Sequence, residues 1–132
     1  MSYTAIEGLG EYDPLRIALR RALHDNGVQV VSVGANPTAT LTIVENRRER
    51  QIIPVDVTNK AQQYELVYIV VFKVKGKDID VPEQRIRLTR EYLFNPTNVL
   101  GRSDQERILY NDMQRDAVQL ILYRLQAETK AG

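Results

Sequence analysis

Apolar residues along this 132-residue chain recur at two different spacings, which separate helical segments from strand segments. The first helical pattern follows Asp13, a good N-cap, and Pro14, which suits a first helical turn; Gly27 is placed to end it. The apolar side of this helix consists of Leu15, Ala18, Leu19, Ala22 and Leu23. We therefore predict an amphipathic helix between Asp13 and Gly27.

A longer helical pattern lies near the C-terminus. Ser103 and Glu106 have the spacing of a capping box, in which each side chain binds a free backbone N–H of the first turn. The predicted helix runs from about Asp104 to Ala127, and residues 128–132 are predicted to form a frayed tail. Its expected buried stripe consists of Leu109, Met113, Ala117, Leu120, Ile121 and Leu125.

Alternation with a period of two predicts the strands, because successive side chains of a strand point to opposite faces of its sheet. It is clearest from Tyr64 to Val74, and the hairpin loop Lys75–Asp78 leads from there to a second long run, Val81 to Glu91. Further strands are predicted at Tyr3–Gly8, Val28–Val33, Thr40–Glu45 and Ile52–Thr58. The arginines before the last of these are assigned to a solvated hairpin loop: Arg47, Arg48 and Arg50.

The order of these elements predicts one α+β domain spanning residues 1–132. Two amphipathic helices must bury their apolar sides, and a sheet with one apolar face offers the surface they need. We therefore expect a two-layer sandwich, with two helices packed on one face of a four- to five-stranded, mostly antiparallel sheet.

Composition excludes several kinds of chemistry. The chain has no cysteine, so thiol catalysis, disulfides and zinc–thiolate sites are ruled out. The single histidine, His24, lies near the end of the first helix, where we expect it to interact with backbone carbonyls rather than act as a base. The candidate acids lie among charged or turn residues: Glu45, Glu49, Asp56, Asp78, Asp80 and Glu83. We therefore expect no enzymatic activity, no metal site and no cofactor.

Charge and hydropathy limit the partners. Lys and Arg number 18 against 17 Asp and Glu, so no overall field attracts nucleic acid. The aromatics Tyr64, Tyr68 and Phe72 share their face with aliphatic residues, and we expect them in the core rather than stacked on bases. No run approaches the roughly 18 consecutive apolar residues of a transmembrane helix.

Several motifs, each modest alone, are together fairly specific in order and spacing. They are Lys75–Ile79, Arg87–Pro96, Ser103–Glu106 and Arg115–Ala117, joined by Pro14–Leu15, Asn26–Val28 and Gln63–Glu65. In this arrangement, which covers nearly the whole chain, the sequence resembles the LptE family of lipopolysaccharide-assembly lipoproteins, also called rare lipoprotein B.

The resemblance implies a function and a place in the cell. Members of the family are outer-membrane lipoproteins of Gram-negative bacteria that plug the β-barrel of LptD, assist its assembly and bind lipopolysaccharide during delivery to the cell surface. They begin with a lipobox cysteine that carries a lipid anchor. Since this chain has no cysteine, we expect that the anchored segment has been removed from the sequence and that the remaining part is soluble.

The resemblance also implies binding residues. In the family, basic residues at one end of the sheet and in the loop before the last helix are linked to lipopolysaccharide binding. Lys77 matches a basic hairpin residue, Arg87 and Arg90 match basic strand positions, and Arg102 matches the loop position. The hairpin Thr58–Lys60 departs from the pattern, because a neutral residue replaces an arginine there.

Two other interpretations of the residues stay open. A generic α+β protein-interaction module, oligomerising through an exposed strand edge, requires no site chemistry at all. A small hydrolase or a nucleic-acid binder lacks the motifs that such a function needs, and salt-sensitive binding of oligonucleotides would be its signature.

Overall fold

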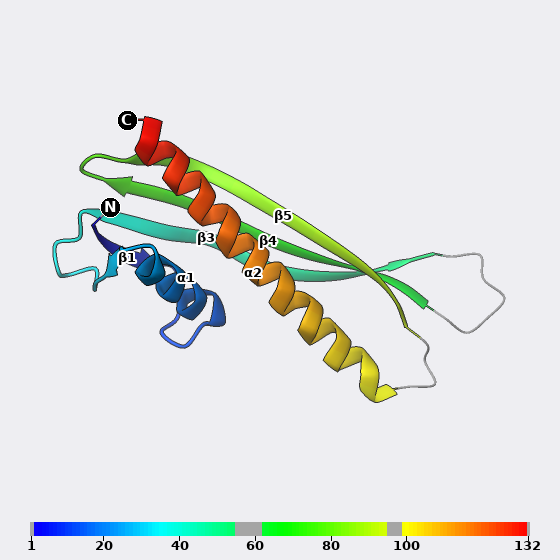
Figure 1. The fold of residues 1–132 in the computed structure, drawn as a ribbon. Coiled ribbons are helices and arrows are strands. Elements are labelled where there is room, and N and C mark those ends of the chain that lie inside the picture. The colour runs from blue at the N-terminus through cyan, green and yellow to red at the C-terminus, as the bar shows by residue number, and fades with distance from the viewer. Residues whose placement is uncertain (1, 55–61, 95–98, 132) are drawn as a thin grey trace.

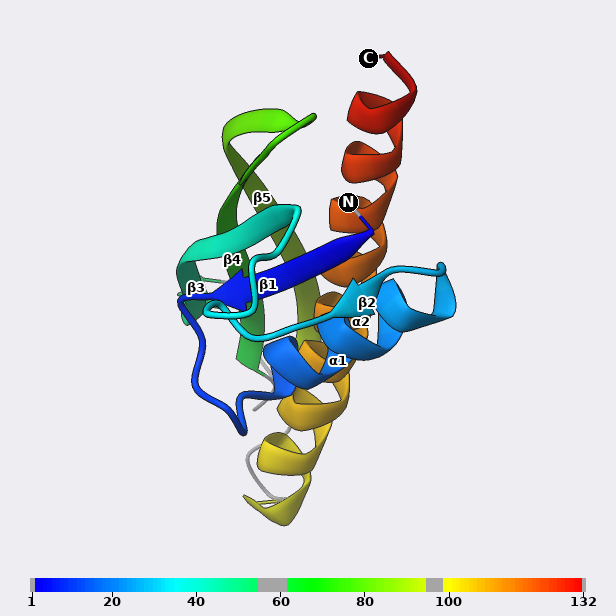
Figure 2. The same ribbon diagram turned by 90° about the vertical axis from the view of Figure 1, so that its left-hand side faces the viewer.

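The computed structural model describes residues 2–54, 62–94 and 99–131 and has two layers (Figure 1). A five-stranded sheet forms one layer, and the helices α1 (Pro14–Asp25) and α2 (Val99–Ala131) form the other. Both helices lie on the same face of the sheet (Figure 2). The predicted two-layer α+β sandwich is confirmed.

Three strands of 15 residues each make up most of the sheet: β3 (Ala39–Ile53), β4 (Gln62–Gly76) and β5 (Asp80–Phe94). The short strands β1 (Tyr3–Glu7) and β2 (Gln29–Val30) complete it, in the order β2-β1-β3-β4-β5. β1 pairs in parallel with β2 and β3, whereas β4 is antiparallel to both β3 and β5. The long strands are therefore antiparallel, as predicted.

β3 differs most from the prediction. It is one continuous strand, whereas the sequence predicted two strands joined by an arginine-containing hairpin loop. A bulge between Ile43 and Glu45 shifts the alternation, and beyond it both faces of the strand carry charged side chains. The part of β3 beyond the bulge therefore lacks the alternation of apolar and polar residues that would indicate a strand. The end of the predicted strand Ile52–Thr58 and the hairpin Thr58–Lys60 lie outside the described residues.

α1 follows its predicted end signals. The Asp13 carboxylate accepts a hydrogen bond from the Leu15 backbone N–H at 2.9 Å, and Pro14 occupies the first turn. At the other end Gly27 has φ +81°, a conformation that suits glycine because it has no Cβ. The prediction of this helix is confirmed at both ends.

α2 is longer than predicted and starts earlier. It begins at Val99, so Ser103 lies inside the helix and is not its N-cap; the predicted capping box is wrong. Glu106 lies beyond the first turn, so its carboxylate is not needed for capping. It pairs instead with Arg50 of β3 and with Arg102 one turn earlier in α2. The helix also continues to Ala131, through residues that were predicted to form a frayed tail. At 1.5 Å per residue, its 33 residues extend for about 50 Å.

The core lies between the helices and one face of the sheet. Its sheet side is the predicted apolar face of β4, all of it buried: Tyr64, Leu66, Tyr68, Val70, Phe72 and Val74. Its helical side includes Leu15, Leu19 and Leu23 of α1 and Met113, Ala117, Ile121 and Leu125 of α2. Leu120, predicted to be buried, is 36% exposed, while Val118 and Leu122 are buried. The buried side of α2 follows the four-residue spacing of Met113, Ala117, Ile121 and Leu125, and the side chain of Leu120 lies outside that stripe.

A second apolar cluster of Val67, Ile69 and Val71 lies on the other face of β4. We call this side of the sheet, away from both helices, the open face. The residues paired with the cluster are mostly charged: Glu45, Arg47 and Glu49 on β3, and Arg85, Arg87 and Thr89 on β5. The aliphatic stems of such side chains cover apolar neighbours while their charged ends stay in water, which accounts for the burial of the cluster.

Candidate functional site

Two arginines, two tyrosines and a glutamate gather where the first turns of α2 approach the sheet. We call Arg50, Tyr64, Tyr92, Arg102 and Glu106 the arginine–tyrosine cluster. Strand register places Tyr64 opposite Tyr92, and their rings stack with centroids 5.3 Å apart. The Arg50 and Arg102 guanidinium carbons lie 5.5 and 5.8 Å from the centre of the Tyr64 ring, within cation–π range. One ring thus orients two cations that come from different elements.

Glu106 binds both cations of the cluster. Its Oε2 atom lies 3.3 Å from Arg50 Nη1 and 3.6 Å from Arg102 Nε. The Tyr92 hydroxyl is buried without a hydrogen-bond partner among the described residues. Burial, and then the Glu106 carboxylate nearby, raise the pKa of Tyr92 above its ordinary value, so the hydroxyl keeps its proton. It therefore remains a hydrogen-bond donor close to a carboxylate.

A further arginine, Arg48, lies beside this cluster on the same face of β3. Its guanidinium carbon is 5.1 Å from the Tyr110 ring centre and 6.0 Å from that of Tyr68. The Tyr110 hydroxyl donates a hydrogen bond of 2.9 Å to the backbone oxygen of Glu49. These contacts join α2 to β3 and so hold the arginine–tyrosine cluster in place.

The open face carries a different arrangement of charge. Arg47 Nε lies 3.2 Å from a carboxylate oxygen of Glu45 and 3.2 Å from one of Glu49, its neighbours two residues away on β3. Across the sheet, Arg87 lies 3.9 Å from Glu65. Charges of both signs alternate over the thin apolar cluster beneath, so this face is polar without a strong field of one sign.

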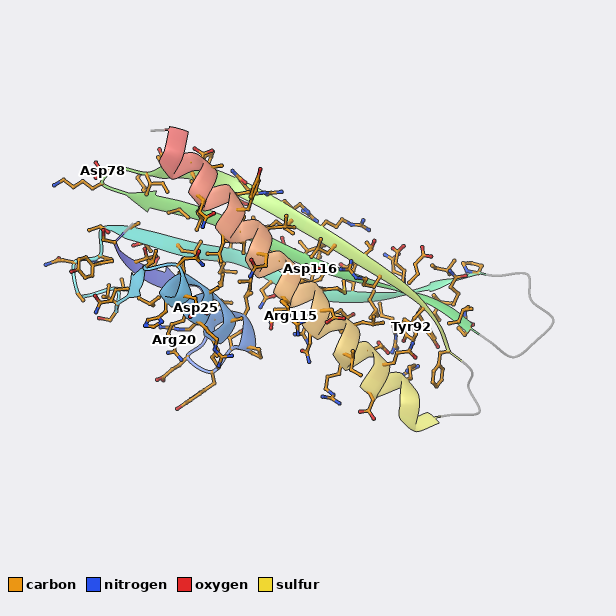
Figure 3. The ribbon with its side chains drawn as sticks, in the orientation of Figure 1. Arg20, Asp25, Asp78, Tyr92, Arg115 and Asp116 are labelled. Atoms are coloured by element: carbon orange, nitrogen blue, oxygen red, sulfur yellow. The ribbon has the colours of Figure 1, made fainter. Side chains whose placement is uncertain are left out.

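The structure distributes the four predicted binding residues over both faces and both ends of the sheet. Lys77 follows β4 in the turn next to Asp78, at the end of the sheet opposite to Tyr92 (Figure 3). Arg87 lies on the open face, whereas Arg90 lies on the helical face and binds Asp116 of α2. Register places Arg90 opposite Leu66, so Lys77 is roughly 35 Å farther along β4.

Arg102 lies near the start of α2, inside the helix rather than in the predicted loop. Its direct cationic neighbour is Arg50, a residue that sequence reasoning assigned to a solvated loop. The signal that could have placed Arg50 is its spacing from Ile52. Arg48, Arg50 and Ile52 are two residues apart along β3 and therefore share one face, and the strand register pairs Ile52 with Tyr64 of the core face. The four predicted residues therefore do not form one cluster, and the cluster that does form includes only Arg102 of them.

Other chemistry finds little support in the part of the chain that the structure describes. His24 is exposed, with Asp25 3.8 Å from its Nδ1 atom. Across residues 2–54, 62–94 and 99–131, no three acidic or histidine side chains are grouped so that they could hold a metal ion. Neither described helix combines the length and the apolar character that crossing a membrane requires. Asp56, a candidate acid, lies outside the described residues.

Known proteins resemble the chain over most of its length. "LPS-assembly lipoprotein LptE" of Photorhabdus laumondii is 24% identical over 114 residues, which cover 86% of this chain but only 63% of that protein. The crystal structure of rare lipoprotein B from Shewanella oneidensis superposes with a TM-score of 0.81 at 25% identity, covering 95% of this chain and 94% of the other. Lipoprotein B from Nitrosomonas europaea superposes with a TM-score of 0.80 at 29% identity, covering 100% and 87%.

The family model described as "LptE: Lipopolysaccharide-assembly" matches residues 5–125, a span that includes most of β1, the other four strands, α1 and most of α2. On that match, the chain belongs to the LptE family of lipopolysaccharide-assembly proteins.

Proposed function

We propose that this chain is a non-enzymatic component of lipopolysaccharide assembly in the outer membrane of a Gram-negative bacterium. In this proposal it binds lipopolysaccharide, plugs the LptD β-barrel and assists the assembly of that barrel. A lipid anchor at the N-terminus of the native protein attaches it to the periplasmic side of the membrane. The family match over residues 5–125 carries the proposal.

The polar open face supports docking inside a barrel. Barrel lumens are polar, so a plug needs outer surfaces that carry hydrogen-bonding and charged groups. The ion pairs of Arg47 with Glu45 and Glu49 present both signs of charge on this face. Three antiparallel strands of 15 residues, with α2 lying along them, provide a stiff frame for such a surface (Figure 1).

Affinity purification from membranes tests the barrel partner. We expect the protein, supplied with an N-terminal lipid anchor and a tag, to recover LptD in a near one-to-one ratio from detergent-solubilised outer membranes. The same anchored protein carrying Ile121→Asp, which removes a fully buried side chain of α2, should recover none. Recovery of soluble partners without LptD would contradict the proposal and favour the generic interaction module, whose docking surface would be the outer edge of β5.

Cationic side chains support the lipid ligand. Lipid A carries phosphate groups, and arginine offers planar, multidentate donors that match phosphate oxygens. We propose that Lys77, Arg87, Arg90 and Arg102 contact lipopolysaccharide. Since these residues lie far apart, they would contact different parts of one large ligand rather than a single phosphate.

A charge-reversal pair tests these contacts. The double substitution Arg87→Asp with Arg102→Asp should leave the fold intact and weaken lipopolysaccharide binding by about a hundredfold or more, because each of the two lost charged hydrogen bonds contributes roughly 1.5–3 kcal/mol. Circular dichroism and surface-immobilised lipopolysaccharide supply the two measurements. Binding by the unaltered protein should also fall as salt rises.

The matched control is Arg107→Asp with Arg115→Asp. Both arginines are well exposed on α2 and pair with acids of their own helix, and the change in net charge is the same. We expect this control to bind within about twofold of the unaltered protein, because exposed pairs contribute little. Equal binding by the two folded double variants would mean that Arg87 and Arg102 are ordinary surface charges.

A further inference from the structure

Glu106 differs from the other paired carboxylates among the described residues in its burial and in its number of partners. Its side chain is 13% exposed, although the Arg50 and Arg102 side chains that it binds are 41% and 38% exposed. The acids of the outer helical pairs, Asp104 and Asp112, are 70% and 52% exposed and bind one arginine each. The Glu106 carboxylate thus lies beneath two cations whose outer edges face solvent.

The two arginines form a ready-made anion site. Both guanidinium groups lie within cation–π range of the same Tyr64 ring, and they come from β3 and α2, so their spacing depends on the packed fold. Arg48 adds a third cation on the same face of β3. Within the cluster two positive charges are balanced by one carboxylate, so the site keeps a net positive charge.

Glu106 has a second possible partner within the cluster. The Tyr92 hydroxyl is buried and protonated, it has no short hydrogen bond among the described residues, and Glu106 is the carboxylate that interacts with it and raises its pKa. A carboxylate that leaves the arginines can accept a hydrogen bond from this hydroxyl. Moving the Glu106 carboxylate away from the arginines therefore costs less free energy than leaving it buried without any hydrogen-bond partner.

We infer that Glu106 is an internal counter-anion that holds the position of a ligand phosphate between Arg50 and Arg102, so that a phosphate group binds there by displacing the Glu106 carboxylate. The inference rests on the proposed function for its ligand, a phosphorylated saccharide lipid. Free inorganic phosphates share the chemistry of that ligand. Glu106 limits the affinity of the site and favours ligands with more than one negative charge, which outcompete a single carboxylate.

Neutralising Glu106 tests the inference. In the Glu106→Gln variant, we expect inorganic pyrophosphate and lipopolysaccharide each to bind about three- to tenfold more tightly, since one or two partly exposed ion pairs no longer compete. The pyrophosphate titration is followed by NMR on the side-chain Nε–Hε signals of Arg50 and Arg102, which report on this site. Lipopolysaccharide binding is measured on an immobilised surface.

Asp104→Asn is the matched control. It removes the same charge from α2 two residues away, but Asp104 pairs with Arg107 and not with the cluster. Affinity for both ligands should stay within about twofold of the unaltered protein. A second variant, Glu106→Asp, keeps the charge on a shorter side chain and should give a smaller increase, because its carboxylate still competes for the arginines.

The outcomes separate the inference from the proposed function. If the unaltered protein binds lipopolysaccharide and Glu106→Gln binds both ligands no more tightly, the inference is wrong and the proposed function stands. If pyrophosphate binding tightens at Arg50 and Arg102 while no form of the protein binds lipopolysaccharide, the internal counter-anion stands and the lipid ligand is wrong.

Discussion

Replacing Ile121 with aspartate is expected to unfold the protein or to lower its Tm by at least about 10 °C. Ile121 of α2 is fully buried against the sheet, and removal of a large core side chain costs about 2–5 kcal/mol. The introduced carboxylate adds the penalty of a buried charge without a partner. These costs together approach the whole stability of a typical domain, about 5–15 kcal/mol. Thermal unfolding followed by circular dichroism measures the effect.

The neighbouring residue supplies the control. Leu120 is 36% exposed, so the aspartate of Leu120→Asp can remain in water. We expect this variant to lose about 1 kcal/mol or less and to keep its cooperative transition. If Leu120→Asp unfolded the protein and Ile121→Asp did not, α2 would be rotated about its axis relative to the described packing.

Replacing Gly8 with alanine is expected to be the most damaging single-methyl change outside the core. Gly8 has φ +92°, and a Cβ built there would lie 2.1 Å from the backbone oxygen of Ile43. The left-handed conformation costs an alanine about 1–2 kcal/mol, and relieving the contact by shifting β3 adds roughly 1–3 kcal/mol. We therefore expect a loss of about 2–5 kcal/mol, measured by urea unfolding.

Two further glycines separate these causes. Gly27 has φ +81° with open space around it, so Gly27→Ala should lose only the conformational part, about 1–2 kcal/mol. A Cβ at Gly76 would lie 2.4 Å from the backbone oxygen of Thr38, so Gly76→Ala should lose only the part that comes from the contact, roughly 1–3 kcal/mol. If Gly8→Ala cost no more than Gly27→Ala, the close approach of Gly8 to β3 would be wrong.

The close packing of Gly8 against β3 also affects the candidate site. The backbone oxygen that Gly8 approaches belongs to Ile43, at the bulge of β3. The bulge sets the phase of the strand beyond it, and with it the face on which Arg48 and Arg50 lie. A change that removed the bulge would shift the strand beyond it by one residue and carry both arginines to the open face. A folded Gly8 variant that lost the bulge should therefore also lose phosphate binding at the arginine–tyrosine cluster.

Secondary structure could be predicted wherever apolar residues recurred at one regular spacing throughout a segment. α1 could be predicted with its ends, because cap, proline and glycine all stood at their preferred positions. The buried face of β4 could be predicted from its alternation of large apolar residues. For α2 the type of element was right but its start was not, because the spacing of Ser103 and Glu106 suits a helix interior as well as a cap.

The candidate site was much less predictable. The family resemblance named Arg102, but Arg50 lies 52 positions earlier in a segment rich in arginine and glutamate. Such a segment has no apolar face, so its sequence alone does not distinguish a solvated loop from a strand. Pairing with β4 makes it a strand, and the bulge at Ile43 then turns Arg50 toward Tyr64 and α2.

What the sequence alone determined was therefore local: the two amphipathic helices, the alternating strands, and the absence of cysteine chemistry. These features depend on interactions between residues a few positions apart, and spacing along the chain records them. Which charges meet depends on the tertiary structure. Arg50, Glu106 and Tyr92 come together from β3, α2 and β5 because strand register and helix packing bring them there, and neither is recorded in local spacing.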